Sequence, residues 1–185
     1  MREFRHWQPL IRVVLVALFI RLMVMVFVYP ARLDADRDHF GFGYEAARIA
    51  RSMVLGHGYS APMPLPSGPT AWVAPIYPLL EAGVFRFFGI YSKASAITML
   101  VLQDLFSAFT CAPIFLIGKK TFGTTVGLRA AWLWAFFPNA IYVCNHWIWE
   151  TSLTTLMLAL LFLLTLQLEV STCARSRLYW KEQSK

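Results

Sequence analysis

The sequence predicts an all-α integral membrane protein, and three observations carry this prediction. Hydrophobic residues make up 58% of the 185-residue chain and charged residues only 15%, with a mean hydropathy of +0.54. A soluble domain is usually about half apolar and about one quarter charged. The apolar residues also form long runs, and basic residues gather at the ends of those runs. We therefore expect a single membrane domain over residues 1–185, without a separate soluble unit.

Four runs come near the about 20 apolar residues that a membrane-spanning helix needs. The first run follows Arg2 and Arg5, as in a signal peptide. Because it is as long as a span and ends without a small-residue cleavage site, we expect it to remain as an anchor. The sequence thus predicts about four transmembrane helices, near residues 10–29, 94–117, 126–143 and 148–170.

Basic residues mark three places in the chain as cytoplasmic, because cytoplasmic ends of membrane helices are rich in lysine and arginine. This pattern predicts a multi-pass protein of the inner (plasma) membrane with both termini in the cytoplasm. It also accounts for the net charge of +7, so no nucleic-acid partner is expected. The three places are the N-terminus (Arg2, Arg5, Arg12), the connection with Lys119, Lys120 and Arg129, and the tail with Arg175, Arg177, Lys181 and Lys185.

The same charge pattern makes residues 30–93 one large external loop. The apolar stretch 74–90 lies inside it and carries Glu81 and Arg86. If this stretch crossed the membrane, Lys119 and Lys120 would fall outside, so we expect a re-entrant or interfacial helix.

A second helix is expected earlier in the external loop, over residues 44–55. Ala46, Ile49, Ala50 and Met53 fall at helical spacing on one side, with polar residues on the other. This pattern predicts an amphipathic helix that lies on the membrane surface.

Three acidic residues of the external loop are candidate catalytic groups: Asp36, Asp38 and Glu45. A carboxylate beside the membrane can take a proton from an acceptor hydroxyl, or bind a divalent cation that neutralises a lipid phosphate. The alternatives are that Asp36 and Asp38 form a solvated turn and that Glu45 stabilises a helix N-terminus. No histidine or cysteine spacing indicates a metal site.

Two further residues are candidates for substrate binding. Glu150 follows an aromatic segment at the external end of the last span, on the same side as Asp36. Its alternative role is that of an ordinary acid in the first turn of a helix. Arg21 lies within the first span, where it could meet a lipid phosphate or pair with an acid. Asp104 lies within the second span, and for it we favour hydrogen bonds that hold neighbouring helices together.

Several segments resemble the GT-C superfamily of membrane glycosyltransferases, in particular the bacterial branch of family 39 that is related to protein O-mannosyltransferases and aminoarabinose transferases. Residues 36–41 (DRDHFG) are similar to the Asp-Glu-x-His-Phe-Gly element of the mannosyltransferases. Residues 46–52 with 56–59 (GHGY) resemble the helix of the family's first loop, and residues 75–79 (PIYPL) with Phe88-Gly89 resemble the next element. Residues 119–123 (KKTFG) resemble its first cytoplasmic turn.

This resemblance implies transfer of a sugar from a polyprenyl-phosphate-linked donor on the periplasmic side, with inversion and with a first-loop acid as general base. Asp36 is the best positional match for that acid. Arg37 stands where the family has glutamate, so Asp38 and Glu45 stay open as substitutes. Family members have more spans, so the resemblance implies that this chain holds the N-terminal part of such an enzyme. A C-terminal part would then be a partner, and the chain alone would have little activity.

Two other classes of function fit the same composition. A non-catalytic membrane scaffold or assembly subunit would need its helix faces but not its external acids. A transporter subunit would place Arg21 and Asp104 along a water-filled path.

Overall fold

A computed structural model describes residues 2–32, 40–65 and 67–183, with side chains described over residues 7–27, 41–65 and 67–169. In this part of the chain every regular element is a helix, apart from one isolated bridge between Ser60 and Pro69. The elements are α1 (Arg2–Arg32), the short 3-10 helix η1 (Phe40–Phe42), α2 (Glu45–Val54), α3 (Ile76–Phe88), α4 (Lys93–Phe109), α5 (Cys111–Phe122), α6 (Thr124–Ala135), α7 (Pro138–His146) and α8 (Thr151–Gln183).

Three helical stretches among the described residues are long and apolar enough to cross a membrane: Trp7–Phe27, Lys93–Phe122 and Thr151–Glu169. The second joins α4 to α5 through Thr110, whose backbone stays helical. Pro113 has no N–H to donate to the carbonyl of Phe109, which explains why the helix is interrupted there. These stretches match three of the four predicted spans.

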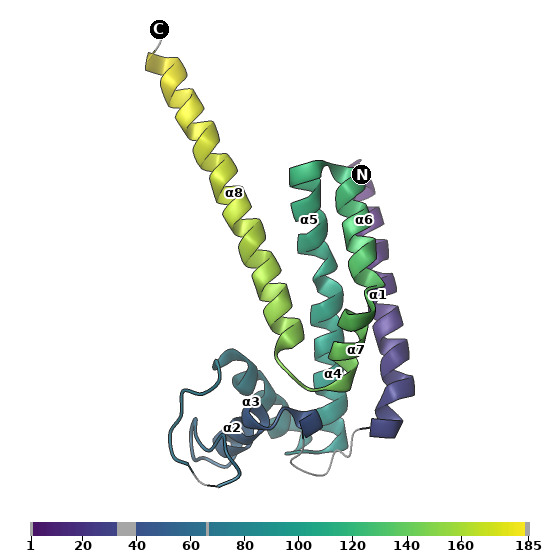
Figure 1. The fold of residues 1–185 in the computed structure, drawn as a ribbon, viewed down its shortest axis with the longest axis vertical. Helices are drawn as coiled ribbons and strands as arrows, with labels where there is room; N and C mark the ends of the chain where they lie inside the picture. The colour runs from purple at the N-terminus through teal and green to yellow at the C-terminus, as the bar shows by residue number, and fades with distance from the viewer. Residues whose placement is uncertain (1, 33–39, 66, 184–185) are drawn as a thin grey trace.

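The fourth predicted span, over residues 126–143, is divided into two helices. Phe137 takes an extended conformation (φ −65°, ψ 111°) and Pro138 begins α7. A residue before proline is disfavoured in the helical region, and proline is tolerated at the first position of a new helix. Together α6 and α7 still lead from one end of the bundle to the other (Figure 1).

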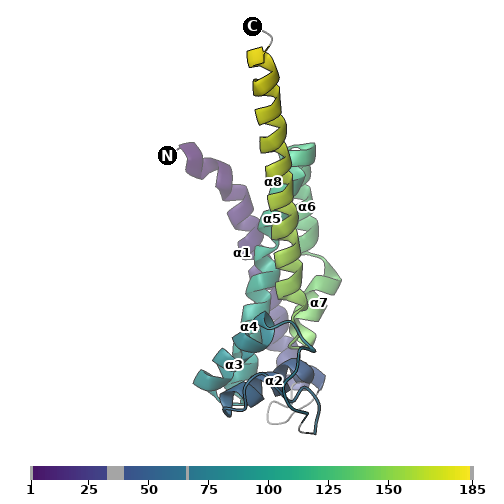
Figure 2. The same cartoon turned by 90° about the vertical axis from the view of Figure 1, so that its left-hand side faces the viewer.

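The elements are sorted between two ends of the bundle (Figures 1 and 2). The start of α1, the turn between α5 and α6 and the end of α8 lie at one end. Helices α2 and α3 lie at the other. The segments that carry the three basic clusters are therefore on the same side of the fold, and their cytoplasmic location remains a prediction.

The bundle itself is packed around small residues. A Cβ on Gly118 would lie 2.7 Å from the Cα of Gly127, and one on Gly127 would lie 2.5 Å from the carbonyl oxygen of Phe115. Only glycine allows α5 and α6 to approach this closely, a kind of packing that is also common between membrane helices. Alanines of α1 and α6, among them Ala17, Ala131 and Ala135, extend the same core.

A second core lies at the end formed by α2 and α3. The apolar face of α2 (Ala46, Ala47, Ile49, Ala50) is buried there against an aromatic cluster of Phe42, Phe85 and Tyr91, whose ring centroids are 5.3–5.8 Å apart. The helix predicted over residues 44–55 is thus confirmed. The prediction that its apolar face lies on the membrane is wrong, because that face packs within the protein.

Helix α3 confirms the helix expected within residues 74–90. Its 13 residues span about 20 Å, too short for a hydrocarbon core of about 30 Å. One face packs into the second core, while Ile76, Leu79 and Phe87 on another face are exposed. An exposed apolar face on a short helix is typical of an interfacial helix.

Candidate functional site

Two segments far apart in the sequence meet at the α2–α3 end of the fold. The first, residues 41–45, leads into α2, and the second, residues 147–150, leads into α8. The backbone N–H of Ile148 donates to the carbonyl of Gly41 at 2.8 Å. Gly43, with φ +74°, lies so close that an added Cβ would be 2.5 Å from the Ile148 carbonyl oxygen and 2.8 Å from Cδ1 of Trp149. The close contact therefore requires glycine at position 43.

Gln103 of α4 holds the second segment in place through two hydrogen bonds. Its Nε2 donates to the carbonyl of Trp147 at 3.0 Å, and its Oε1 accepts from the backbone N–H of Trp149 at 3.0 Å. The side chain is buried, so both halves of the amide satisfy backbone groups that would otherwise lack partners. We call the contacts of Gly43 and Gln103 with residues 147–150 the Gly43–Gln103 clamp. The clamp fixes the position of residues 147–150 relative to α2.

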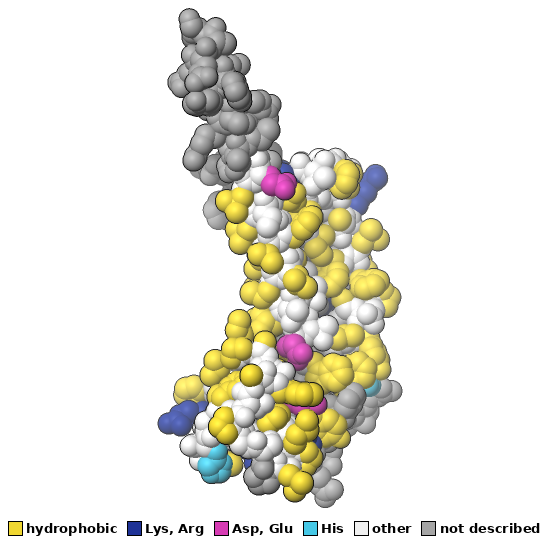
Figure 3. Space-filling view, turned by 60° about the vertical axis from the view of Figure 1, so that its left-hand side comes forward, with side chains coloured by type: hydrophobic (Ala, Val, Ile, Leu, Met, Phe, Trp, Pro, Cys, Tyr) yellow, Lys and Arg dark blue, Asp and Glu magenta, His cyan; other side chains and the backbone are white. Residues whose placement is uncertain are grey.

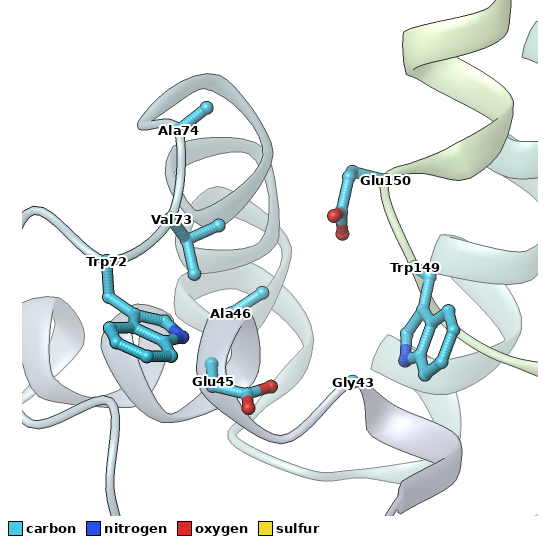
Figure 4. Close-up of a pocket in the computed structure, with 8 residues that line it drawn as sticks. All are labelled: Gly43, Glu45, Ala46, Trp72, Val73, Ala74, Trp149 and Glu150. Atoms are coloured by element: carbon cyan, nitrogen blue, oxygen red, sulfur yellow. The ribbon is translucent and has the colours of Figure 1, made fainter.

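A cavity of about 390 Å³ opens beside this clamp (Figure 4). Glu45, from the first turn of α2, and Glu150, just before α8, both contribute carboxylates to it. Trp72 lies on one side and Trp149 on the other (Figure 4). No lysine or arginine is among the lining residues, which are Gly43, Glu45, Ala46, Trp72, Val73, Ala74, Trp149 and Glu150.

An apolar groove of about 270 Å³ adjoins the cavity and shares Val73, Ala74 and Glu150 with it. Its walls come from the start of α3 and from α8. In Figure 3, hydrophobic side chains run along α8, and acidic side chains lie where this surface meets the α2–α3 end. The remaining residues of the groove are Ile76, Tyr77, Leu153, Thr154, Met157, Leu158 and Leu161.

Glu81 is a titratable residue near this site that sequence reasoning treated only as part of the loop. It lies on the buried face of α3, one turn after Tyr77, and is fully buried. Neither of its carboxylate oxygens has a hydrogen-bond partner among the described residues. Burial, together with the negative charge of Glu150, raises the pKa of Glu81 well above its usual range. The spacing of Tyr77, Glu81, Val84 and Phe85 on one helix face was the signal that could have placed it in the core.

Glu81→Gln is expected to stabilise the protein at neutral pH and to have little effect at about pH 4. The folded state raises the pKa of Glu81 above 4.5. Its contribution to stability is therefore fully present below the unfolded pKa and is lost as pH rises toward the folded pKa. Because glutamine does not titrate, its advantage should grow with pH. Thermal midpoints from about pH 4 to about pH 8 measure this, with exposed Glu169→Gln as control. An offset that stays constant with pH would contradict the explanation.

Arg21 lies outside the cavity, inside the helix bundle. Its guanidinium donates to Ser107 Oγ at 2.9 Å, and to the backbone carbonyls of Ala17, Ala135 and Trp134 at 3.0, 3.1 and 3.3 Å. The last two carbonyls are at the C-terminus of α6, where the helix breaks before α7; that of Trp134 also accepts from the backbone N–H of Phe137 at 3.2 Å. The structure thus brings Glu45 and Glu150 together and separates Arg21 from them.

The contact that Asp104 makes agrees with the prediction that this residue holds neighbouring helices together. Its Oδ1 accepts from Nδ2 of Asn145, in α7, at 3.2 Å. Asn145 also donates to the carbonyl of Ile141 at 3.0 Å. This buried contact between an amide and a carboxyl group links α4 to α7.

Asp36 and Asp38 fall outside the described residues, so their predicted roles stay predictions. Within the described side chains, no group of three or more histidines, cysteines, aspartates or glutamates could hold a metal ion.

Comparison of the chain with models of protein families, with curated proteins and with solved structures found no match in any of the three. The features of the molecule that bear on its function are therefore the cavity, the groove and the Gly43–Gln103 clamp.

Proposed function

We propose that the protein is a membrane glycosyltransferase, or the N-terminal part of one, that transfers a sugar from a polyprenyl-phosphate-linked donor to an acceptor hydroxyl. The observation that carries this proposal is the junction of a cavity holding two carboxylates with an apolar groove along α8. Such a junction suits a ligand with a polar head and a long apolar tail. In this proposal the protein lies in the inner membrane, with the cavity on the periplasmic side and both termini in the cytoplasm, as the charge pattern of the sequence predicts.

The donor would lie with its prenyl chain in the groove and its sugar in the cavity. Trp72 and Trp149 flank the cavity and offer flat apolar surfaces to a sugar ring. Glu150 lines both the cavity and the groove, so it could orient sugar hydroxyls near the bond to be broken.

The reaction is an inverting displacement. A first-loop carboxylate, either Asp36, Asp38 or Glu45, takes the proton of the acceptor hydroxyl as its oxygen attacks the anomeric carbon. The bond between that carbon and the phosphate oxygen breaks, and the polyprenyl phosphate leaves with the electron pair. Of the three acids, Glu45 is the one that the described structure places in the cavity.

Sugar transfer from a polyprenyl-phosphate-linked donor, measured in membranes that contain the protein as it occurs in its cell, tests the proposal. Replacing the general base by its amide (Asp36→Asn, Asp38→Asn or Glu45→Gln) should lower kcat by about 10²–10⁴-fold. Leu158→Trp should fill the groove and raise the donor KM. The matched control is Leu164→Trp, because Leu164 is exposed on α8 and does not line the groove.

The same experiment separates the enzyme from a non-catalytic scaffold. A scaffold would show no transfer that depends on this protein, and the three acids would be replaceable without loss of assembly. If transfer occurs but Leu158→Trp and Leu164→Trp behave alike, the donor does not use the groove.

A further inference from the structure

A second pocket, of about 340 Å³, lies between α2 and the loop that follows it. It is separate from the carboxylate cavity, and the two have no lining residue in common. Among the described residues, three basic side chains line it and no acidic residue does. Its lining residues are Arg48, Arg51, Ser52, Leu55, His57, Ala61, Met63, Pro64 and Leu65.

The basic groups of this pocket are presented in different ways. The guanidinium of Arg48 lies 4.7 Å from the centre of the Tyr44 ring and donates to the carbonyl of Pro62 at 3.4 Å. These contacts fix its direction before any ligand binds. Arg51 and His57 are exposed, and no carboxylate of the described residues pairs with either of them. The pocket therefore combines one fixed cation with two basic groups that are available to a ligand.

The wall opposite α2 is also held in place. Ser52 Oγ and Ser60 Oγ are 2.7 Å apart, and Ser60 Oγ donates to the carbonyl of His57 at 3.0 Å. The loop then pairs with itself, since the N–H of Ala61 donates to Gly68 and that of Thr70 donates to Tyr59, both at 3.1 Å. A pocket built from fixed walls loses little entropy when it binds a ligand.

We propose that this pocket binds the phosphate group of an anionic ligand. Guanidinium groups match the geometry of phosphate oxygens, and hydrogen bonds between charged partners are the stronger ones. The rim adds an apolar contact, because Leu55, Met63 and Leu65 are 51%, 42% and 78% exposed. The shared chemistry is a phosphate group, which either a phospholipid headgroup or a soluble phosphate ester could supply. This site is independent of the proposed transferase reaction.

Binding is tested on the whole protein in nanodiscs of phosphatidylcholine. One arm adds inorganic phosphate, with sodium chloride at equal ionic strength as the control for salt, and follows the shift in Tm. The other arm adds phosphatidylglycerol and counts retained lipid by native mass spectrometry. We expect Arg51→Ala/His57→Ala to weaken binding at least about tenfold, because hydrogen bonds from basic side chains to phosphate are lost.

Both replaced side chains are exposed, so the double variant should fold. Arg86→Ala is the matched control, since Arg86 is an exposed arginine on α3 away from the pocket. Arg51→Lys should restore part of the affinity, whereas Arg51→Glu should abolish it. Binding of phosphate alone identifies a soluble ester as the source, and binding of phosphatidylglycerol alone identifies a lipid headgroup. Absence of both, or equal binding by all variants, overturns the proposal.

Discussion

Gly43→Ala is expected to lower the stability of the protein and to abolish the function of the cavity. The backbone at position 43 has φ +74°, which costs an L-residue about 1–2 kcal/mol. The new Cβ would also lie 2.5 Å from the carbonyl oxygen of Ile148 and 2.8 Å from Trp149. One contact is with backbone, so the segment that carries Trp149 and Glu150 must move away from α2.

That movement would increase the separation between Glu45 and Glu150 across the cavity. A displacement of about 1 Å in a catalytic group can lower a rate about 10²-fold, so transfer should fall more than stability alone explains. Thermal unfolding and transfer, measured on the same preparation, give the two effects.

Gly83→Ala is the control, because Gly83 is exposed within α3 with no atom within 4 Å of an added Cβ. It should be neutral or stabilising by about 0.5–1 kcal/mol. Equal behaviour of the two variants would mean that the Gly43–Gln103 clamp does not position the cavity.

The main helices could be predicted because their information is local in the sequence. Long apolar runs at 10–29 and 148–170 correspond to α1 and α8, and residues 94–117 fall within α4 and α5. The spacing of Ala46, Ile49 and Ala50 predicted α2. The same spacing could not say whether the apolar face meets lipid or protein, because both environments favour apolar side chains. Only the packing against Phe42, Phe85 and α3 decides it.

The candidate site was predictable in part. The charge bias of the sequence predicted that Glu45 and Glu150 lie on the same side of the membrane, and both line one cavity in the structure. The role of Gln103 was not predictable, since it depends on two backbone groups 44 and 46 residues away. The break between α6 and α7 has a local signal, which is Pro138 itself. The long apolar run over residues 126–143 nevertheless suggests one continuous span. The burial of Glu81 also has a local signal, its helical spacing with Tyr77, Val84 and Phe85, but its negative charge favours a solvated position in a mixed-charge loop.

Arg21→Met is expected to be the most destabilising single substitution among those considered, because it removes every polar contact of a fully buried cation. The guanidinium donates to Ser107 and to three backbone carbonyls, two of them at the end of α6. A buried acceptor that loses its partner typically costs about 1–3 kcal/mol, and Arg21→Met removes the donor to several acceptors at once.

Unfolding of the Arg21→Met variant by denaturant in nanodiscs measures this loss, with Arg12→Met on the exposed side of α1 as control. Arg12→Met should change stability by less than about 0.5 kcal/mol. Arg21→Lys should rescue little, since an ammonium cannot reproduce the planar set of donors that meets Ser107 and three carbonyls at once. The experiment also separates the lipid-phosphate role predicted from the sequence from the structural role that the contacts of Arg21 with Ser107 and backbone carbonyls indicate. If Arg21 bound a lipid phosphate, Arg21→Met would weaken donor binding and leave the unfolding free energy unchanged. A large loss of stability, with donor KM unchanged in the fraction that remains folded, assigns Arg21 to holding the broken end of α6 against α1.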